Sequence, residues 1–211
     1  MPNWCLNKVL IKVPNDNLLK KLRNALGNEI DPPTYIRLGD GRIVTQGAPN
    51  LFNQLVPRPN AIAEGDNFWK WEMDNWGVKG DATPRDIYWP DEYTVNFEIL
   101  TAWGPPLAFF ENIERMGYLV NGYYLEELTC LLGVYYEGNN DTYEYSELSP
   151  DQMETELPSW VNQLFSLIDN KRIEEQANTE GNDADLVQAL EDLKKEYENL
   201  TETKKPKSSK K

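Results

Sequence analysis

Histidine is absent from this chain of 211 residues, and cysteine occurs only twice, at Cys5 and Cys130. Zinc in proteins is held mainly by histidine nitrogens and cysteine thiolates, so the lack of histidine and of any C-x-x-C pair argues against a zinc site. Two thiols are also too few for a disulfide framework or an iron–sulfur cluster. The sequence therefore predicts no metal and no cofactor, and a reducing compartment.

Long apolar runs are missing as well. No stretch approaches the roughly 18 apolar residues that a membrane-spanning helix needs. The opening segment MPNWCLNKVLIKV has no cationic start followed by an apolar run, so we expect no secretion signal. These absences together predict a cytoplasmic protein that does not enter a membrane.

Positive charge is scarce: 21 basic residues stand against 35 acidic ones, which gives a net charge of −14. The last eight residues, KKPKSSKK, hold five of the basic residues, so residues 1–203 carry 16 basic and 35 acidic side chains, a net of −19. Such a body repels nucleic-acid phosphates and anionic membranes and attracts a basic protein surface. The alternative is a solvated acidic face that only keeps the protein soluble.

Apolar material is plentiful, with seven Trp and eleven Tyr, and its pattern predicts an α+β fold. Two helices on one face of an antiparallel sheet would give a ferredoxin-like arrangement. The predicted helices follow Asn15 or Asp16, ending at Gly27, and run from Pro106 to Met116. The predicted strands are Trp4–Val13, Phe68–Met73, Tyr93–Trp103, Leu128–Glu137 and Thr142–Glu147, the last two forming a hairpin around GNND.

Three segments lie outside this regular pattern. Residues 28–67 contain five Pro and four Gly and predict an irregular insertion in a domain of residues 1–147, from which Leu51–Val56 docks on the core. Residues 148–203 predict a helical extension, with one helix over Pro158–Arg172 and one that begins at Asp183. The second helix has a short apolar seam, which predicts packing on the protein or on a second copy as a homodimer: Leu186, Leu190, Leu193 and Tyr197. The basic tail, residues 204–211, is expected to be disordered.

Four motifs occur in a fixed order: MPNWCLNKVLI at the start, FNQLVPRP from Phe52, NWGVKGDA from Asn75 and TAWGPP from Thr101. In these motifs the chain resembles the YubB-type family of small ferredoxin-like proteins from bacteriophages and plasmids. Members of that family typically show NWGTKWDA, so Val78 and Gly80 depart from the pattern. The resemblance covers about residues 1–147. It implies a ferredoxin-like fold and a phage or plasmid source, and it supplies no enzymatic activity that carries over to this chain. We expect structural roles for the following residues of these motifs: Trp4, Asn75, Trp76, Gly77, Trp103, Pro105 and Pro106.

The NWGVKGDA stretch admits two interpretations. In one, Lys79 and Asp81 stand beside Trp76 and grip a partner. In the other, Trp76 fills the core, the glycines Gly77 and Gly80 adopt backbone angles closed to other residues, and Asp81 binds local amides. We favour the structural interpretation and keep Lys79 and Asp81 as candidate partner-binding residues.

No catalytic group stands out. The adjacent carboxylates Glu126–Glu127 and Asp91–Glu92 would point to opposite faces of a strand, which does not suit an acid/base pair. Cys5 and Cys130 both fall in predicted strands and are expected to be inert core residues. The sequence predicts that the protein is not an enzyme.

The function that fits best is a phage accessory protein that binds and inhibits a host factor, such as a defence enzyme or toxin that acts on nucleic acid. Residues 151–203 hold 14 acidic and four basic residues, so the expected contact residues are Glu191, Asp192, Glu196 and Glu198. One alternative is single-stranded nucleic-acid binding by aromatic residues on a sheet face, namely Trp69, Trp71, Tyr135, Tyr143 and Tyr145. A small enzyme is the other.

Overall fold

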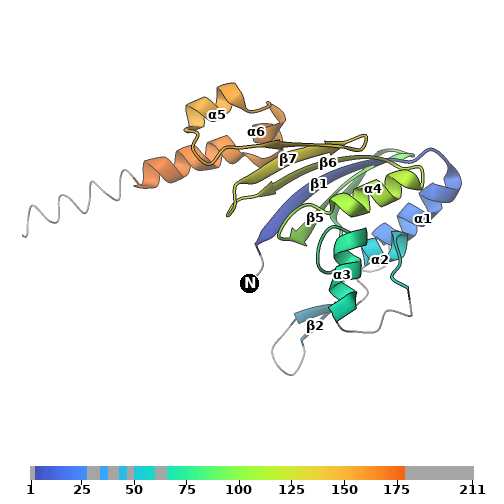
Figure 1. The fold of residues 1–211 in the computed structure, drawn as a ribbon. Coiled ribbons are helices and arrows are strands. Elements are labelled where there is room, and N and C mark those ends of the chain that lie inside the picture. Colours follow the sequence, from blue (N-terminus) through green and yellow to red (C-terminus); the bar gives the residue numbers. More distant parts are fainter. Residues whose placement is uncertain (1–2, 28–33, 38–42, 47–49, 60–65, 179–211) are drawn as a thin grey trace, which may run out of the picture. The chain divides into compact units, whose positions relative to one another are not determined.

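The computed structural model describes residues 3–27, 34–37, 43–46, 50–59 and 66–178. The chain divides into two compact units, residues 1–147 and residues 148–211. The main sheet of the first unit has helices packed against it (Figure 1).

The sheet has six strands in the order β4-β5-β1-β6-β7-β8, and every neighbouring pair is antiparallel. Helices α1, α2, α3 and α4 lie on one side of it (Figure 1). The prediction of an α+β fold with an antiparallel sheet is confirmed. The strands are β1 (Trp4–Lys12), β4 (Arg85–Asp91), β5 (Thr94–Ala102), β6 (Leu119–Glu126), β7 (Leu131–Tyr136) and β8 (Asn139–Tyr143).

Strand β1 alternates along its length, because every second side chain points into the core. Cys5, Val9 and Ile11 are buried on the helix side, together with Asn7. The Asn7 amide is satisfied there, since it donates to the Thr101 hydroxyl at 2.8 Å and to the Cys5 carbonyl at 3.0 Å. The predicted strand at this position is confirmed.

The helices α1 (Asp16–Leu26) and α4 (Leu107–Arg115) begin and end where their capping residues predict. The Asn15 side chain accepts from the Leu18 amide at 3.1 Å, and Gly27 follows the last turn with φ 80°. Helix α4 starts directly after Pro106 and is followed by Gly117 at φ 103°. Both predicted helices are confirmed.

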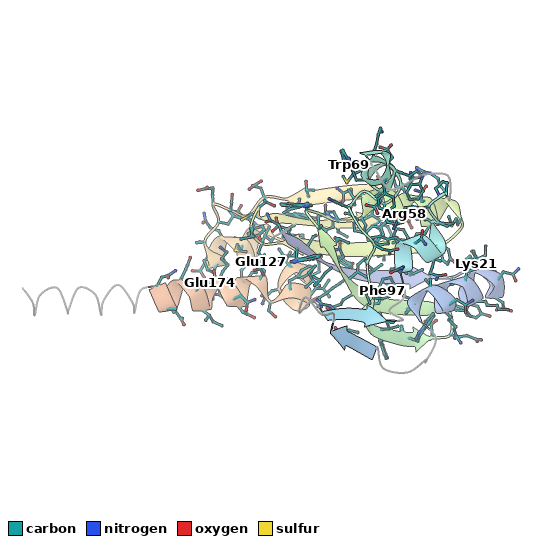
Figure 2. All side chains as sticks on the ribbon, turned by 90° about the horizontal axis from the view of Figure 1, so that it is seen from below. Lys21, Arg58, Trp69, Phe97, Glu127 and Glu174 are labelled. Atoms are coloured by element: carbon teal, nitrogen blue, oxygen red, sulfur yellow. The ribbon has the colours of Figure 1, made fainter. Side chains whose placement is uncertain are left out.

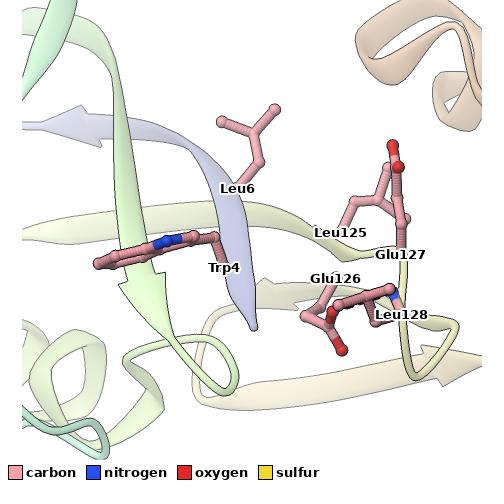
Figure 3. Close-up of a pocket in the computed structure, with 6 residues that line it drawn as sticks. All are labelled: Trp4, Leu6, Leu125, Glu126, Glu127 and Leu128. Carbon is pink, nitrogen blue, oxygen red and sulfur yellow. Dashed lines mark hydrogen bonds between the residues drawn. The ribbon is translucent and has the colours of Figure 1, made fainter. Parts of the chain in front are cut away.

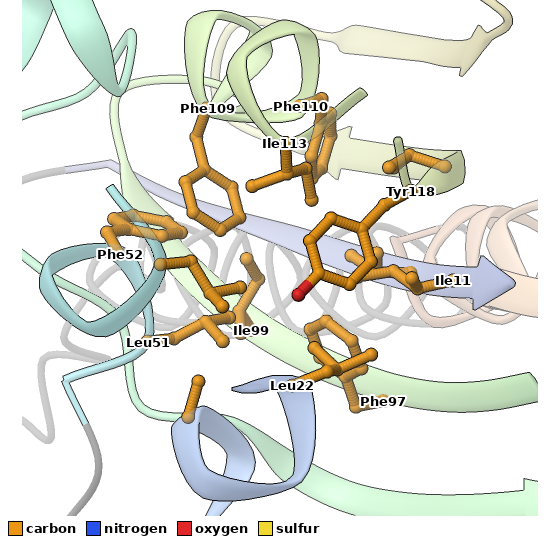
Figure 4. Close-up of a cluster of buried hydrophobic side chains, with 14 of the residues drawn as sticks. Ile11, Leu22, Leu51, Phe52, Phe97, Ile99, Phe109, Phe110, Ile113 and Tyr118 are labelled. Atoms are coloured by element: carbon orange, nitrogen blue, oxygen red, sulfur yellow. The ribbon is translucent and has the colours of Figure 1, made fainter. Parts of the chain in front are cut away.

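The core between helices and sheet combines contacting aromatic rings with a larger number of aliphatic side chains (Figure 4). Phe52 of α2 packs its ring 4.4 Å from that of Phe109 of α4, and Phe110 lies 5.4 Å from Tyr135 of β7, measured between ring centroids. Aliphatic side chains from β1, β5 and α1 fill the remaining space: Ile11, Ile99 and Leu22.

Two strands of the six-stranded sheet were not predicted, and one predicted strand is a helix. The predicted strand Phe68–Met73 is part of helix α3 (Asp66–Asn75), in which Glu72 is buried and Trp69 is exposed. The alternation of aromatic and charged residues in Phe68–Met73 therefore does not reflect the alternating buried and exposed faces of a β-strand. Strands β4 and β6 were not predicted, because each contains a residue that weakens a strand signal, Pro90 and Gly122 respectively.

The insertion at residues 28–67 is more regular than predicted. Its described part contains β2 (Thr34–Arg37) paired with β3 (Ile43–Gln46), and the short helix α2 (Leu51–Leu55). The expected docking of this helix segment is confirmed, because Leu51 and Phe52 are fully buried.

The hairpin β7–β8 is present, but its turn lies two residues earlier than predicted. Glu137 and Gly138 both have positive φ, 47° and 75°, as a two-residue turn of this kind requires, and β8 begins already at Asn139. The predicted strand Thr142–Glu147 is therefore wrong in its bounds. Cys130, expected in a strand, lies in the turn before β7 with φ 54°.

In the second unit, α5 (Pro150–Glu156) starts with a capping box in which Ser149 and Gln152 bond to each other's backbone amides. The predicted helix Pro158–Arg172 is broken: α6 (Trp160–Phe165) ends at Ser166 with φ 52°, and residues 167–178 continue as a helix. Arg172 binds Asp151 at 3.0 Å and Glu154 at 2.9 Å. The final predicted helix with its seam, the acidic residues Glu191, Asp192, Glu196 and Glu198, and the basic tail lie outside the described residues.

Candidate functional site

Trp76, at the centre of the NWGVKGDA motif, is a core residue. Its side chain is fully buried, and its indole N–H donates to the carbonyl of Val56 at 3.0 Å. The rings of Phe52 and Trp71 lie 5.6 and 5.5 Å from the ring of Trp76. The expected burial of Trp76 is confirmed, and the indole joins α3 to the chain that leaves α2.

Other residues of the NWGVKGDA loop contact the backbone of neighbouring helices. Gly77 has φ 80°, and a Cβ atom there would lie 3.1 Å from the backbone nitrogen of Ala108. The Asp81 carboxylate accepts from the amides of Phe52 at 2.7 Å, Asn53 at 2.9 Å and Ala82 at 2.8 Å. The predicted hydrogen bond from a local amide, that of Ala82, is present, and the Asp81 carboxylate also accepts two hydrogen bonds from the first turn of α2. Lys79 is exposed.

Burial raises the pKa of Asp81 above its usual value, against the opposing effect of these amides and of Arg58. Its carboxylate is engaged by three backbone amides, which supports the structural interpretation of the loop. Asn75 also acts locally: its amide donates to the Trp71 carbonyl at 2.9 Å, and its own carbonyl accepts from the Asn112 amide at 2.8 Å.

Arg58 belongs to this same structural cluster. Its guanidinium carbon lies 4.0 Å from the ring centre of Phe68 and 4.9 Å from that of Trp76. Its Nη2 is 3.6 Å from the buried carboxylate of Glu72, whose other oxygen accepts from the Gly80 amide at 2.9 Å. Two aromatic rings and one carboxylate therefore hold a cation inside the first unit.

Trp103, in the TAWGPP motif, behaves differently from Trp76. It follows the last residue of β5, has φ 73° and is 61% exposed. Its amide donates to the Asn3 carbonyl at 2.8 Å, which places it beside the start of β1. Pro105 and Pro106 then lead into α4, as predicted.

Large apolar side chains gather around this end of the sheet. Trp4 is 56% exposed and pairs with Ala102, the neighbour of Trp103. Leu6 pairs with the partly exposed Leu100 on one side and with Leu125 on the other. We call this set the apolar corner: Trp4, Leu6, Leu100, Trp103 and Leu128, the last 78% exposed.

A pocket of about 190 Å³ opens at the apolar corner, lined by Trp4, Leu6, Leu125, Glu126, Glu127 and Leu128 (Figure 3). Its origin lies in the strand register. The pairing of β1 with β6 stops at Leu6 and Leu125, and β6 ends at Glu126 in a turn over residues 127–130. Trp4 therefore lies beyond the end of the pairing between β1 and β6, and the pocket occupies the space beside it where β6 is absent.

Two carboxylates line the pocket, and they point in different directions (Figure 3). Glu126 is buried, and its oxygens accept from the amides of Leu128 at 2.9 Å and Thr129 at 3.0 Å and from the Thr129 hydroxyl. Glu127 is exposed. Cys5 lies nearby, and its burial, followed by the charge of Glu126, raises its pKa to about 12.

The aromatic sheet face expected for base stacking does not form from the predicted residues. Trp69 and Trp71 lie on α3, and Tyr135 and Tyr145 are buried. Tyr143 ends β8. The expected inert core role fits Cys5, which is fully buried, but is wrong for Cys130, which is partly exposed in a turn.

The apolar corner was missed at the sequence level, although two of its residues had been singled out for structural roles. Comparison with known proteins gives no match to a family model, to a curated protein or to a solved structure. Within the described residues, no helix is long and apolar enough to cross a membrane, and no group of His, Cys, Asp or Glu side chains is arranged to hold a metal ion.

Proposed function

We propose that the protein is a non-enzymatic binding protein and that a partner protein docks on the apolar corner. The observation that carries this is the exposure of Trp4, Trp103 and Leu128, at 56, 61 and 78%. Trp4 and Leu128 line the same pocket, and the backbone of Trp103 lies beside the start of β1. Exposed apolar side chains at one end of a sheet mark a candidate interaction surface, and tryptophan is enriched among the residues that dominate binding energy.

The charge of the chain indicates the nature of the partner. With a net charge of −14, the protein attracts a basic surface and disfavours nucleic acid. The narrower form of the proposal is an accessory protein of a phage, acting in the host cytoplasm, that inhibits a host enzyme or toxin that works on nucleic acid. This form rests on the resemblance to the YubB-type family.

A ferredoxin-like core is part of the proposal. The strands β1, β4, β5 and β6 follow in sequence with α1 after β1 and α4 after β5, and they lie in the order β4-β5-β1-β6. A βαββαβ chain whose first strand lies between the third and the fourth supports a ferredoxin-like core, to which β7 and β8 are added at one edge.

The test compares proteins captured from bacterial lysate by the wild type and by the double variant Trp4→Ala, Trp103→Ala. The matched control is Trp69→Ala, because Trp69 is 52% exposed but lies on α3, apart from Glu127 of the pocket (Figure 2). We expect a partner that the control retains and the double variant loses. Retardation of single-stranded DNA or RNA in a low-salt gel, with no such partner, would favour the nucleic-acid alternative instead.

The acidic C-terminal residues should set the association rate. The Debye length falls from about 10 Å at 0.1 M salt to about 3 Å at 1 M, so steered association slows as salt is added. Charge reversal to Lys at four positions should slow it at low salt while leaving the helical content unchanged: Glu191, Asp192, Glu196 and Glu198. The measurement is a biosensor on-rate across a salt series with the captured partner. A flat salt response with a normally binding variant would contradict electrostatic steering.

A further inference from the structure

The pocket at the apolar corner has the chemistry of a receptor for one cationic side chain. We propose that it binds an arginine presented by an extended, basic segment of the partner. The inference rests on the proposed function in one respect, namely that the partner is a protein.

The size of the pocket favours a single side chain. Sites for drug-sized ligands usually enclose about 300–1,000 Å³, whereas this one encloses about 190 Å³. It is open to one side because the turn after β6 carries the chain away from β1, so a segment that passes over the sheet end can insert one residue.

The walls of the pocket match the two parts of an arginine. Trp4 is one of the lining residues and is 56% exposed, and an indole is a side chain on which a planar guanidinium can stack. Leu6 and Leu128 provide apolar surface for the methylene stem. Glu127 is exposed at the pocket and supplies the carboxylate, while the lining includes no Lys or Arg to neutralise it.

The same combination already holds an arginine elsewhere in this chain. Arg58 lies 4.0 Å from the ring centre of Phe68, and its guanidinium is 3.6 Å from the carboxylate of Glu72. An aromatic ring also contacts Arg23, whose guanidinium carbon lies 4.9 Å from the ring centre of Trp89. In the pocket, the aromatic ring and the carboxylate are present and the cation is the missing part.

Charge complementarity points to a partner rather than to a neutral apolar ligand. Residues 1–203 carry a net charge of −19, so a basic segment is drawn to this surface before it docks. The chain has one basic segment of its own, KKPKSSKK at residues 204–211, which contains five Lys and no Arg. We prefer an external arginine because the weakly hydrated guanidinium stacks on indole better than the ammonium of lysine does.

The experiment titrates the full-length chain with three peptides of the form GSGXGSG in which X is Arg, Lys or Gln. The readout is the indole N–H signal of Trp4 in a proton–nitrogen correlation spectrum. We expect a saturable shift with the Arg peptide, with a dissociation constant on the order of 1 mM, and at least about 5-fold weaker binding of the Gln peptide.

Variants test the two walls separately. Glu127→Gln should weaken the Arg peptide about 3-fold, as loss of one exposed ion pair does, and Trp4→Leu, followed through the amide signals of Leu6 and Leu128, should weaken it about 3- to 5-fold. The matched control is Glu92→Gln, since Glu92 is exposed in the turn between β4 and β5 and should leave the affinity unchanged.

Three results would overturn the inference. One is equal binding of the Arg and Gln peptides, and another is an unchanged affinity in Glu127→Gln. The third is a shift of the Trp4 indole signal when residues 204–211 are deleted in the absence of any peptide, because the occupant would then be the chain's own tail. If the Arg peptide fails but the double tryptophan variant still loses a captured partner, the proposed function stands and only the arginine site is wrong.

Discussion

Asp81 gives the sharpest test of whether the NWGVKGDA loop is a structural element or a binding site. Its carboxylate accepts from three backbone amides, two of which, Phe52 and Asn53, belong to the first turn of α2. The N-cap residue of that helix, Asn50, makes no capping bond with its own side chain. Asp81 therefore acts as the cap of α2 from a distance of almost 30 residues along the chain.

The expected cost of Asp81→Ala follows from these contacts. Loss of a capping side chain costs about 0.5–2 kcal/mol, and a hydrogen bond to a charged group contributes about 1.5–3 kcal/mol. Burial raises the pKa of Asp81, so the cost of removing its charge from water offsets part of the stabilisation from these hydrogen bonds. We expect a net loss of about 2–3 kcal/mol, and a loss of about 1 kcal/mol for Asp81→Asn, which keeps one acceptor oxygen.

The assay is urea unfolding followed by circular dichroism and tryptophan fluorescence. With a slope of about 1–3 kcal/mol per molar urea, the Ala variant should shift the midpoint by about 1 M or more. Asp74→Ala is the control, because Asp74 lies close by in sequence but is 58% exposed in an ion pair with Lys70. If Asp81→Ala is as stable as the control yet loses partner binding, the loop is a binding site and the structural interpretation is wrong.

Three further predictions concern the buried aromatic and ionisable side chains. Trp76→Ala should lower the unfolding free energy by about 3–5 kcal/mol, whereas Trp69→Ala should change it by less than about 0.5 kcal/mol in the same urea assay. A thiol reagent at about pH 8 should modify Cys130 in the native protein and Cys5 only after unfolding, because Cys5 is buried and its pKa is raised to about 12; equal reactivity would contradict its burial. Between about pH 9 and 12 the unfolded state releases the Cys5 proton and the folded state retains it, so stability should fall by up to about 1.4 kcal/mol per pH unit, and Cys5→Ala should make this fall shallower in pH-dependent melting.

The parts of the fold that were predicted correctly share strong local signals. Buried and more exposed residues alternate along β1, and α1 is bounded by Asn15 and Gly27. The secondary structure of both elements can therefore be predicted without knowledge of distant contacts. The burial of Trp76 was predictable for a related reason, since a large apolar ring next to glycines in a turn favours packing.

The elements that were missed depend on contacts that lie far apart in sequence. Gly122 weakens the strand signal of β6, yet a side chain there would place its Cβ 2.6 Å from the ring of Phe110. Pro90 is tolerated in β4 because β4 is an edge strand with an irregular register. In α3, Glu72 is buried only because Arg58 and the Gly80 amide bind its carboxylate.

The pocket could not be predicted for a similar reason. Trp4 lies in a strong strand pattern, so the sequence indicates a β-strand but not how far each neighbouring strand accompanies it. The pocket exists because pairing with β6 stops at Leu6 while pairing with β5 continues to Trp4. The end of a pairing is set by the turn at residues 127–130, and the buried Glu126 that holds this turn was interpreted as one member of an adjacent carboxylate pair.

The dipeptide Trp-Gly occurs twice in the motifs of the chain, and the two tryptophans differ in burial. Trp76 is fully buried and stabilises the fold through its packing and its bond to Val56. Trp103 is 61% exposed and has φ 73°, a backbone conformation that costs a residue with a Cβ about 1–2 kcal/mol. The backbone strain at Trp103 is therefore not offset by burial of its ring in the core. Strained backbone conformations of this kind are found often at functional sites. Stability accounts for Trp76 but not for Trp103, which is why the apolar corner, rather than the NWGVKGDA loop, is the surface on which partner binding is proposed.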